Sequence, residues 1–212
     1  MPTRIKICGI TRIEDALAAA QLGADAIGLM FWPHSARYVT PQQARDIVAA
    51  LPPFITAVGV YVNPDPAWVE ETARAARLNL LQFHGDEAHE TPQFCQQLGT
   101  QLCLPYLKAA RVKAGMDLLQ YAARYNGAQG LLLDAYVEGA PGGTGSSFDW
   151  NLIPASLPVP MILSGGLNAQ NVATAIRKVR PYAVDVSSGV ESAKGIKDKT
   201  KIAEFIEAAR RG

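Results

Sequence analysis

The sequence predicts an α/β fold, a single-domain (β/α)₈ barrel of the TIM-barrel architecture that spans residues 1–212. Short apolar or β-branched runs alternate with stretches of helical periodicity along the whole chain, which is typical of parallel βαβ units. Eight strand–helix units over this length average about 26 residues each, close to the lower size limit for such a barrel. The chain is 49% hydrophobic and 18% charged, so it is able to bury a sizeable core.

The predicted strands are the short apolar runs, and the stretches between them favour helices. They span residues 4–8, 26–31, 55–62, 80–83, 102–106, 130–134, 161–164 and 183–186. The last helix is the clearest, because apolar residues near the C-terminus repeat at the three-four spacing of one buried helix face. These residues are Ile202, Phe205, Ile206 and Ala209.

Capping residues mark several helix starts. Thr40-Pro41 precedes one predicted helix, Asn63-Pro64-Asp65-Pro66 precedes another, and Asn168 precedes a third that we expect to begin at Ala169. The alternative fold is a doubly wound open sheet, which would normally carry a G-x-G-x-x-G turn after its first strand. Gly9-Ile10-Thr11 is not such a turn, so the sequence favours the barrel.

The composition limits the kinds of molecule that this protein is expected to bind. The formal net charge is +1 and no long Lys/Arg block is present, so nucleic-acid binding is not expected. No secretory signal or membrane-length apolar run is visible either, and we expect a cytoplasmic protein, a monomer or a homodimer, that acts on a small molecule. Cys8, Cys95 and Cys103 lack C-x-x-C spacing, which argues against disulfides and a structural zinc site. We expect Cys103 in the fifth strand and Cys95 in the preceding helix to be core residues.

Two candidate proton-transfer groups follow predicted strands, at the end of the barrel where active sites of this architecture lie. Cys8 ends the first strand, and the alternation of strand side chains directs it to the barrel interior together with Lys6. The charge of Lys6 would lower the thiol pKa, and Asp185 on the eighth strand is its expected ion partner. Asp134 ends the sixth strand, nearly opposite the first. Cys8 and Asp134 would thus flank one substrate as base and acid; the alternatives are a buried apolar cysteine and a turn-capping aspartate.

The glycine-rich segments after the last two strands predict a phosphate site. Gly165-Gly166 follows the seventh strand and Ser187-Ser188-Gly189 follows the eighth, although each alone is also compatible with a simple turn. Arg37 is a candidate clamp for a second anion, a carboxylate, or else a solvated arginine. Other candidate substrate contacts are His84, Asp185, and Gly143 in the glycine-rich loop 135–149; the alternative for His84 is a rim histidine without a substrate role. His34 and His84 are not spaced as a metal-binding pair, and no third metal ligand can be identified, so neither a metal nor another cofactor is expected.

Five segments, in order along the chain, resemble the phosphoribosylanthranilate isomerase family, and the resemblance covers essentially the whole sequence. The most specific are the N-terminal Lys-Ile-Cys-Gly and the Asp-Val-Ser-Ser-Gly-Val-Glu of the last strand. Relatives often carry a charged or larger polar residue where this chain has Ser146-Ser147, which concerns loop mobility and affinity. The segments are Lys6-Ile7-Cys8-Gly9-Ile10-Thr11, Gln82-Phe83-His84-Gly85, Gly142-Gly143-Thr144-Gly145 leading to Phe148-Asp149-Trp150, Ser164-Gly165-Gly166-Leu167, and Asp185-Val186-Ser187-Ser188-Gly189-Val190-Glu191.

The resemblance implies an Amadori rearrangement of N-(5-phosphoribosyl)anthranilate in tryptophan biosynthesis, without a cofactor. It implies Cys8 as general base, Asp134 as general acid and Arg37 as the holder of the anthranilate carboxylate. It places the phosphate at Gly166 and at the Ser188-Gly189 backbone.

Three other functions remain open. The related isomerase of histidine synthesis usually carries an aspartate in place of Cys8. A lyase would form a Schiff base through Lys6. A silent phosphate-binding barrel would bind the same ligand without turnover.

Overall fold

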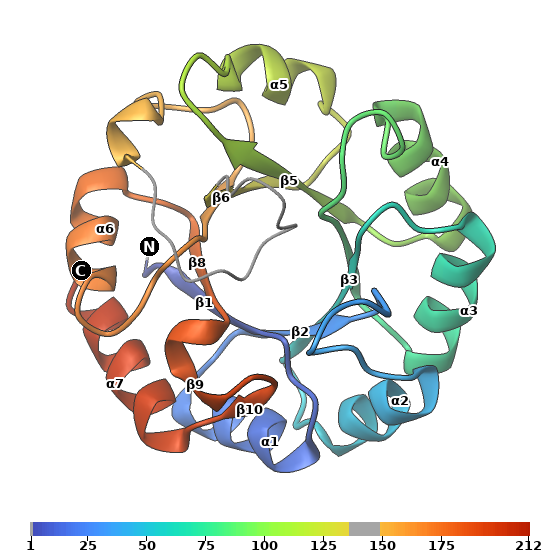
Figure 1. Cartoon of the computed structure of the whole chain (residues 1–212), viewed down its shortest axis with the longest axis vertical. Coiled ribbons are helices and arrows are strands. Elements are labelled where there is room, and N and C mark those ends of the chain that lie inside the picture. Colours follow the sequence, from blue (N-terminus) through green and yellow to red (C-terminus); the bar gives the residue numbers. More distant parts are fainter. Residues whose placement is uncertain (1, 136–148) are drawn as a thin grey trace.

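The strands of the barrel follow one another in chain order, and β1 bonds to β2 on one side and to β8 on the other, which closes the ring (Figure 1). All neighbouring pairs are parallel. The computed structural model describes residues 2–135 and 149–212. The predicted (β/α)₈ barrel is confirmed. Its strands are β1 (Arg4–Cys8), β2 (Ala26–Met30), β3 (Thr56–Tyr61), β4 (Leu80–Phe83), β5 (Tyr106–Val112), β6 (Gly130–Ala135), β7 (Met161–Leu163) and β8 (Ala183–Val186).

Helices cover the outside of the strand ring (Figure 1). Between β6 and β7 the described residues form only a short 3₁₀ turn, η1 (Trp150–Leu152), in place of the helix that the alternation predicts. After β8 the chain forms a second turn, η2 (Ser188–Val190), and a small hairpin of β9 (Glu191–Ala193) and β10 (Ile196–Lys197). The helices are α1 (Ile13–Leu22), α2 (Pro41–Ala50), α3 (Pro66–Ala76), α4 (Pro92–Leu102), α5 (Leu118–Arg124), α6 (Val172–Val179) and α7 (Lys199–Arg210).

Most of the predicted helix signals are confirmed. Thr40 caps α2 in a reciprocal capping box with Gln43, and the Asp65 side chain accepts from the backbone of α3. The apolar face expected for the last helix is buried in α7. The start at Ala169 is wrong, because α6 begins at Val172. The Asn168 side chain instead accepts hydrogen bonds from the next backbone N–H groups and builds a turn ahead of the helix.

The predicted fifth strand is displaced. Leu102 is the last residue of α4, and Cys103 ends this helix in the left-handed region at φ 54°. The strand begins only at Tyr106 and runs to Val112. A short apolar run does not distinguish a helix end from a strand start, and this explains the error. Cys103 is therefore neither in a strand nor in the core; it is exposed, whereas Cys95 is buried in α4 as expected.

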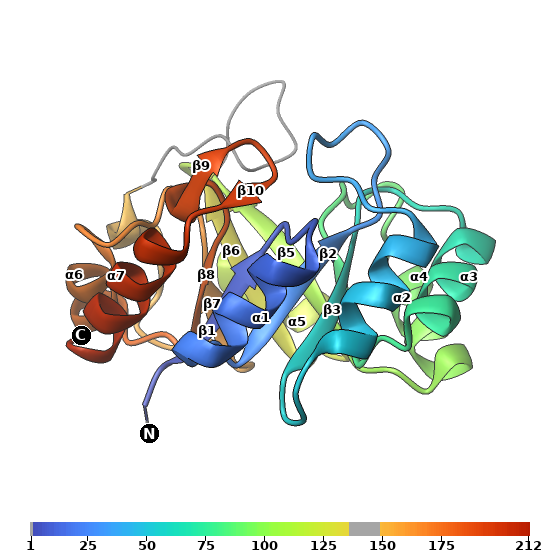
Figure 2. The ribbon, with the colours of Figure 1, turned by 90° about the horizontal axis from the view of Figure 1, so that it is seen from below.

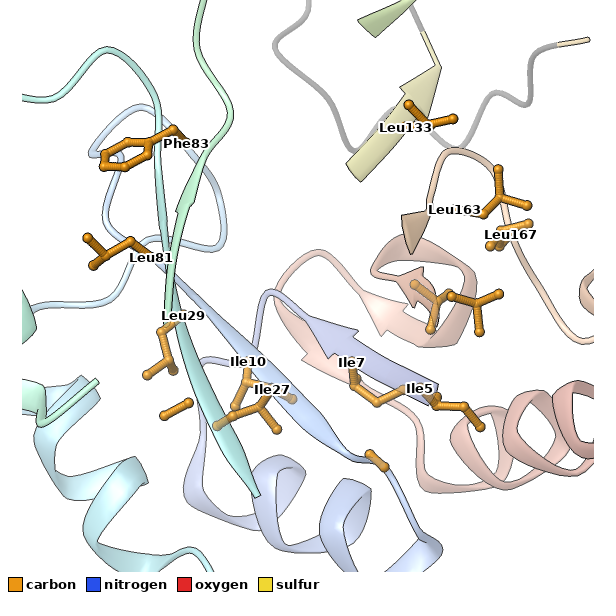
Figure 3. Close-up of a cluster of buried hydrophobic side chains, with 14 of the residues drawn as sticks. Ile5, Ile7, Ile10, Ile27, Leu29, Leu81, Phe83, Leu133, Leu163 and Leu167 are labelled. Carbon is orange, nitrogen blue, oxygen red and sulfur yellow. The ribbon is translucent and has the colours of Figure 1, made fainter. Parts of the chain in front are cut away.

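Strand alternation separates an outer apolar layer from the barrel interior. Figure 3 shows the outer layer, to which β1 contributes Ile5 and Ile7 and β4 contributes Leu81 and Phe83. A smaller interior cluster fills the barrel near the amino ends of β5 to β8. Its members are Leu107, Ala109, Leu132, Ile162 and Ala183. Polar side chains occupy the opposite end of the barrel.

The end of the barrel to which the strands point carries the longer connections. Figure 2 shows the β9–β10 hairpin and the segment between β2 and α2 rising at this end. Active sites of this architecture are built from such connections. Within the described parts of the chain, no helix is long and apolar enough to cross a membrane.

Candidate active site

A cleft opens at the carboxyl ends of the strands, and most of the predicted site residues line it together. Gly189 does not line the cleft; it lies behind it in η2, where a side chain would collide with the Leu167 carbonyl oxygen. Gly143 lies outside the described residues. The predicted residues that line the cleft are Cys8, Arg37, His84, Asp134, Gly166, Asp185 and Ser188.

Cys8 points into the barrel from the end of β1, as predicted from strand alternation. It is opposite Gly28 of β2, where an added Cβ would lie 2.7 Å from the Cys8 sulfur and 3.1 Å from Lys6 Nζ. Burial raises the pKa of the Cys8 thiol, and Asp185 raises it further, while the charges of Lys6 and Lys197 act to lower it. The charge of Lys6 thus acts on the thiol pKa in the expected direction, although the net shift is upward. The effect of Lys6 is real, but desolvation of the thiolate outweighs it.

Lys6 and Asp185 form the predicted ion pair. Their strands are adjacent, the two residues are in register, and Lys6 Nζ lies 2.9 Å from Asp185 Oδ1. Both side chains are buried. Burial alone would lower the pKa of Lys6, but Asp185 and Cys8 raise it above its ordinary value. Lys6 therefore remains an ammonium group, which is not a nucleophile and argues against Schiff-base chemistry at this position.

Asp134 is buried at the end of β6 and is held by two hydrogen bonds. The backbone N–H of the next residue, Ala135, donates to Asp134 Oδ1 at 2.9 Å. His84 Nε2 lies 3.0 Å from Asp134 Oδ2. On the other side of the imidazole, the Gln82 amide nitrogen lies 3.1 Å from His84 Nδ1. With the Gln82 amide nitrogen facing Nδ1, the ring tautomer that satisfies both contacts accepts at Nδ1 and donates from Nε2 to Asp134. The chain Gln82–His84–Asp134 thus fixes the orientation of the carboxyl group.

Arg37 enters the cleft from the segment after β2, and the carboxylate of Glu191 holds its guanidinium group. Its Nε and Nη2 donate to the two oxygens of Glu191 at 2.7 and 2.8 Å. Lys197 Nζ donates to the same carboxylate at 2.9 Å and also to the Ser187 carbonyl oxygen at 3.0 Å. Burial alone would raise the pKa of Glu191, but the Arg37 hydrogen bonds and the Lys197 charge bring it below its usual value. Arg37 and Lys197 therefore share one carboxylate next to the cleft, and burial lowers the pKa of Lys197 below its usual value.

The two glycine-rich turns lie side by side because β7 and β8 are neighbours. Gly165 and Gly166 adopt φ of +85° and +64°, which glycine tolerates best. A Cβ at Gly165 would lie 2.6 Å from Ala135 N and 3.0 Å from Asp134 Oδ1, so this glycine also makes room for Asp134. Asn171 donates to the Gly166 carbonyl oxygen at 2.9 Å and fixes the turn. Such turns offer backbone N–H groups to an anion.

A family model described as N-(5′-phosphoribosyl)anthranilate (PRA) isomerase matches residues 5–208. The chain belongs to this family. The PRA isomerase from Nitrosospira multiformis is 64% identical over 206 residues, which cover 97% of this chain and 96% of that protein.

Solved structures of this family share the fold of the chain. The crystal structure from Thermotoga maritima has a TM-score of 0.87 at 42% identity and covers 98% of both chains. A PRA isomerase in complex with reduced 1-(o-carboxyphenylamino)-1-deoxyribulose 5-phosphate has a TM-score of 0.82 at 39% identity, again with 98% of both chains covered.

In this PRA isomerase family member, sequence reasoning missed the residues that hold the cleft side chains in place. Gln82 and Glu191 lie inside the family motifs, and the motifs were the available signal for them. Lys197 carries no signal in the sequence, because its contact with Glu191 depends on the fold of the β9–β10 hairpin.

Proposed function

We propose that this chain converts N-(5-phosphoribosyl)anthranilate to 1-(2-carboxyphenylamino)-1-deoxyribulose 5-phosphate in tryptophan biosynthesis, with Asp134 as general acid and Cys8 as general base. The observation that carries the proposal is that both groups line one cleft with an arginine and two glycine-rich turns. The ligand of the related complex combines an aryl carboxylate with a sugar phosphate. A cleft with an acid, a base and two anion sites suits such a molecule. The cytoplasmic location and the monomeric or homodimeric state stay predictions.

The reaction needs two proton transfers. Asp134 donates a proton to the furanose ring oxygen, the C1–O bond breaks, and the nitrogen lone pair forms a C1=N Schiff base. The Cys8 thiolate then removes the C2 proton, and the released electron pair forms C1=C2 and neutralises the nitrogen. The enolamine gains a proton at C1 and loses its C2 hydroxyl proton to give the ketone. A raised thiol pKa makes the thiolate a scarce form but a stronger base for this second transfer.

The two anionic ends of the substrate fix its orientation. Arg37 binds the anthranilate carboxylate, since within the described residues Glu191 engages only its Nε and Nη2. A guanidinium has five N–H groups, so donors remain for a ligand. The phosphate binds at Gly166 and at the backbone of Ser188 and Gly189. Lys197 donates to the Ser187 carbonyl oxygen and so helps to fix the backbone just ahead of the phosphate turn.

Replacing Arg37 with methionine is expected to raise KM by roughly 10- to 100-fold, which corresponds to the free energy of one or two charge-assisted hydrogen bonds. The value of kcat should change by less than about threefold, because the carboxylate is bound equally in the ground and transition states. Steady-state kinetics on Arg37→Met measures both. The exposed Arg45 of α2 offers a matched control, Arg45→Met, with unchanged KM. A large loss in kcat at constant KM would instead assign Arg37 to the chemistry.

The thiol of Cys8 should titrate above an ordinary cysteine, because burial disfavours its thiolate. Below the pKa, the alkylation rate follows the thiolate fraction and rises about tenfold for each pH unit. At neutral pH, iodoacetamide should therefore modify the exposed Cys103 well before Cys8, as followed by peptide mass spectrometry over a pH series. An inflection for Cys8 below about pH 8 would show that the neighbouring cations, not burial, decide its pKa.

The proposed function is tested by offering the purified protein both aldose substrates. We expect rapid turnover of N-(5-phosphoribosyl)anthranilate and much slower turnover of the aminoimidazole carboxamide analogue of histidine synthesis. Equal turnover of the second substrate would favour the histidine-pathway alternative. Tight binding of either substrate without turnover would favour the silent phosphate-binding barrel. Borohydride trapping of substrate on Lys6 would favour the lyase.

A further inference from the structure

Among the described residues, one ion pair has no solvent exposure on either side chain, and it lies outside the cleft. Glu90 precedes α4, Lys108 lies on β5, and Lys108 Nζ is 2.7 Å from Glu90 Oε2. Lys108 faces the helices, because its neighbours Leu107 and Ala109 belong to the cluster inside the barrel. Neither residue is a candidate for the chemistry of the proposed function, so the pair needs another explanation.

The contacts of the pair converge on the backbone on both sides of His84. Glu90 Oε2 accepts from Gly85 N at 2.7 Å. Lys108 Nζ donates to the Gly85 carbonyl oxygen at 2.8 Å and to the Phe83 carbonyl oxygen at 3.4 Å. An ammonium group has three donors, and these two carbonyls with Glu90 account for all three. The pair therefore holds the backbone on either side of His84.

The backbone of His84 is held as well. His84 N donates to the Tyr61 carbonyl oxygen at 2.8 Å, and Arg111 Nη2 donates to the His84 carbonyl oxygen at 3.2 Å. The peptide groups from Phe83 to Gly85 thus all have partners. A histidine side chain on a fixed backbone can move only between its own rotamers. The ring of His84 is directed at Asp134.

Glu90 also joins two connections at the rim of the barrel. Its Oε1 accepts from Asn63 N at 2.9 Å, after β3, while Oε2 binds the turn after β4. Gly85 is required at this junction, since an added Cβ would collide with Asn63 Oδ1 and lie 2.5 Å from Glu90 Oε1. The carboxylate is therefore packed directly against the turn that carries His84.

We propose that Glu90 and Lys108 are positioning residues that hold His84 at hydrogen-bond distance from Asp134. The inference rests on the proposed function, in which Asp134 is the general acid. The pair is neutral as a unit, so it fixes the turn without adding net charge next to the acid. A buried ion pair is in general weak evidence for stability, whereas its contacts here are concentrated on one functional turn.

The test is a double-mutant cycle between the ion pair and His84. The Glu90→Gln/Lys108→Met protein removes both charges together and leaves no unpaired buried ion. We expect kcat to fall by about 10- to 100-fold, the effect that hydrogen-bond partners of metal ligands have on activity, with KM changed by less than about threefold. In a His84→Ala background, the same change should lower kcat by less than about threefold further, because the side chain that the pair positions is gone.

A matched control separates positioning from general stability. Tyr121 of α5 donates a buried hydrogen bond to the Ala109 carbonyl oxygen, on the strand that carries Lys108. Tyr121→Phe should lower the melting temperature and leave kcat unchanged. Wild-type kcat in the folded Glu90→Gln/Lys108→Met protein would overturn the inference, and so would an equal loss of kcat with and without His84.

A second variant and a second readout keep the test decisive. If the double variant does not fold, Glu90→Asp keeps the charge and withdraws the carboxylate from Gly85 N, and it enters the same cycle. The ring-nitrogen NMR signals of His84, assigned with His84→Ala, should shift in Glu90→Asp and not in Tyr121→Phe; unshifted signals in Glu90→Asp would overturn the inference. Absence of turnover by wild-type protein contradicts the proposed function, whereas normal wild-type turnover with an unaffected Glu90→Asp protein contradicts only the positioning role.

Discussion

The Asp134→Asn variant is expected to lose about 10²- to 10⁴-fold in kcat, the contribution of one well-placed general acid. An amide keeps the size of the side chain but has no acidic proton to give to the ring oxygen. The change in KM should be far smaller, since no substrate-binding group is removed. Steady-state turnover of N-(5-phosphoribosyl)anthranilate by wild type and variant measures the effect.

The matched control for this variant is Asp117→Asn. Asp117 caps α5 through exposed hydrogen bonds to backbone N–H groups, away from the cleft. It should keep both its activity and most of its stability, because asparagine caps helices about as well as aspartate. If Asp134→Asn retained kcat within about threefold of wild type, the general acid would have to be another group, and His84 would be the first to examine because it contacts the same position.

The Cys8→Ala variant is expected to show a loss of similar size, about 10²- to 10⁴-fold in kcat. Alanine leaves no base near the C2 proton, while the ring-opening acid and both anion sites remain. Substrate should therefore still bind, which fluorescence titration of the inactive variant would measure.

Cys95→Ala is the matched control for Cys8→Ala. Cys95 is also buried but lies in α4, outside the cleft. Its removal should cost stability through lost packing and lower kcat far less than Cys8→Ala does, because its thiol reaches only the Glu90 backbone carbonyl oxygen, at 3.7 Å. Near-normal kcat in Cys8→Ala would remove the cysteine from the mechanism and leave it as a small buried side chain.

The sequence was informative wherever a property depends on strand order and alternation. Lys6 and Asp185 could be paired in advance because β1 and β8 are neighbours in a closed barrel and both side chains point inward. The same reasoning placed Cys8 and Asp134 at one end of the barrel, where both line the cleft.

Properties that depend on burial or on loop conformation were not predictable. The thiol pKa of Cys8 is raised because the fold desolvates it, and no local pattern gives the size of that effect against the charge of Lys6. The contact of Arg37 with Glu191 joins two connections that are far apart in the sequence, and the Glu90–Lys108 pair does the same. The start of β5 was misplaced because apolar residues at the end of α4 resemble a strand.

The most direct test of the account is a fluorescence assay in which N-(5-phosphoribosyl)anthranilate, formed in situ from anthranilate and phosphoribosyl pyrophosphate, is mixed with wild-type, Cys8→Ala or Asp134→Asn protein. We expect rapid loss of substrate fluorescence with the wild type and a loss at least about 100-fold slower with either variant. No turnover by folded wild-type protein, or full turnover by either variant, would contradict it.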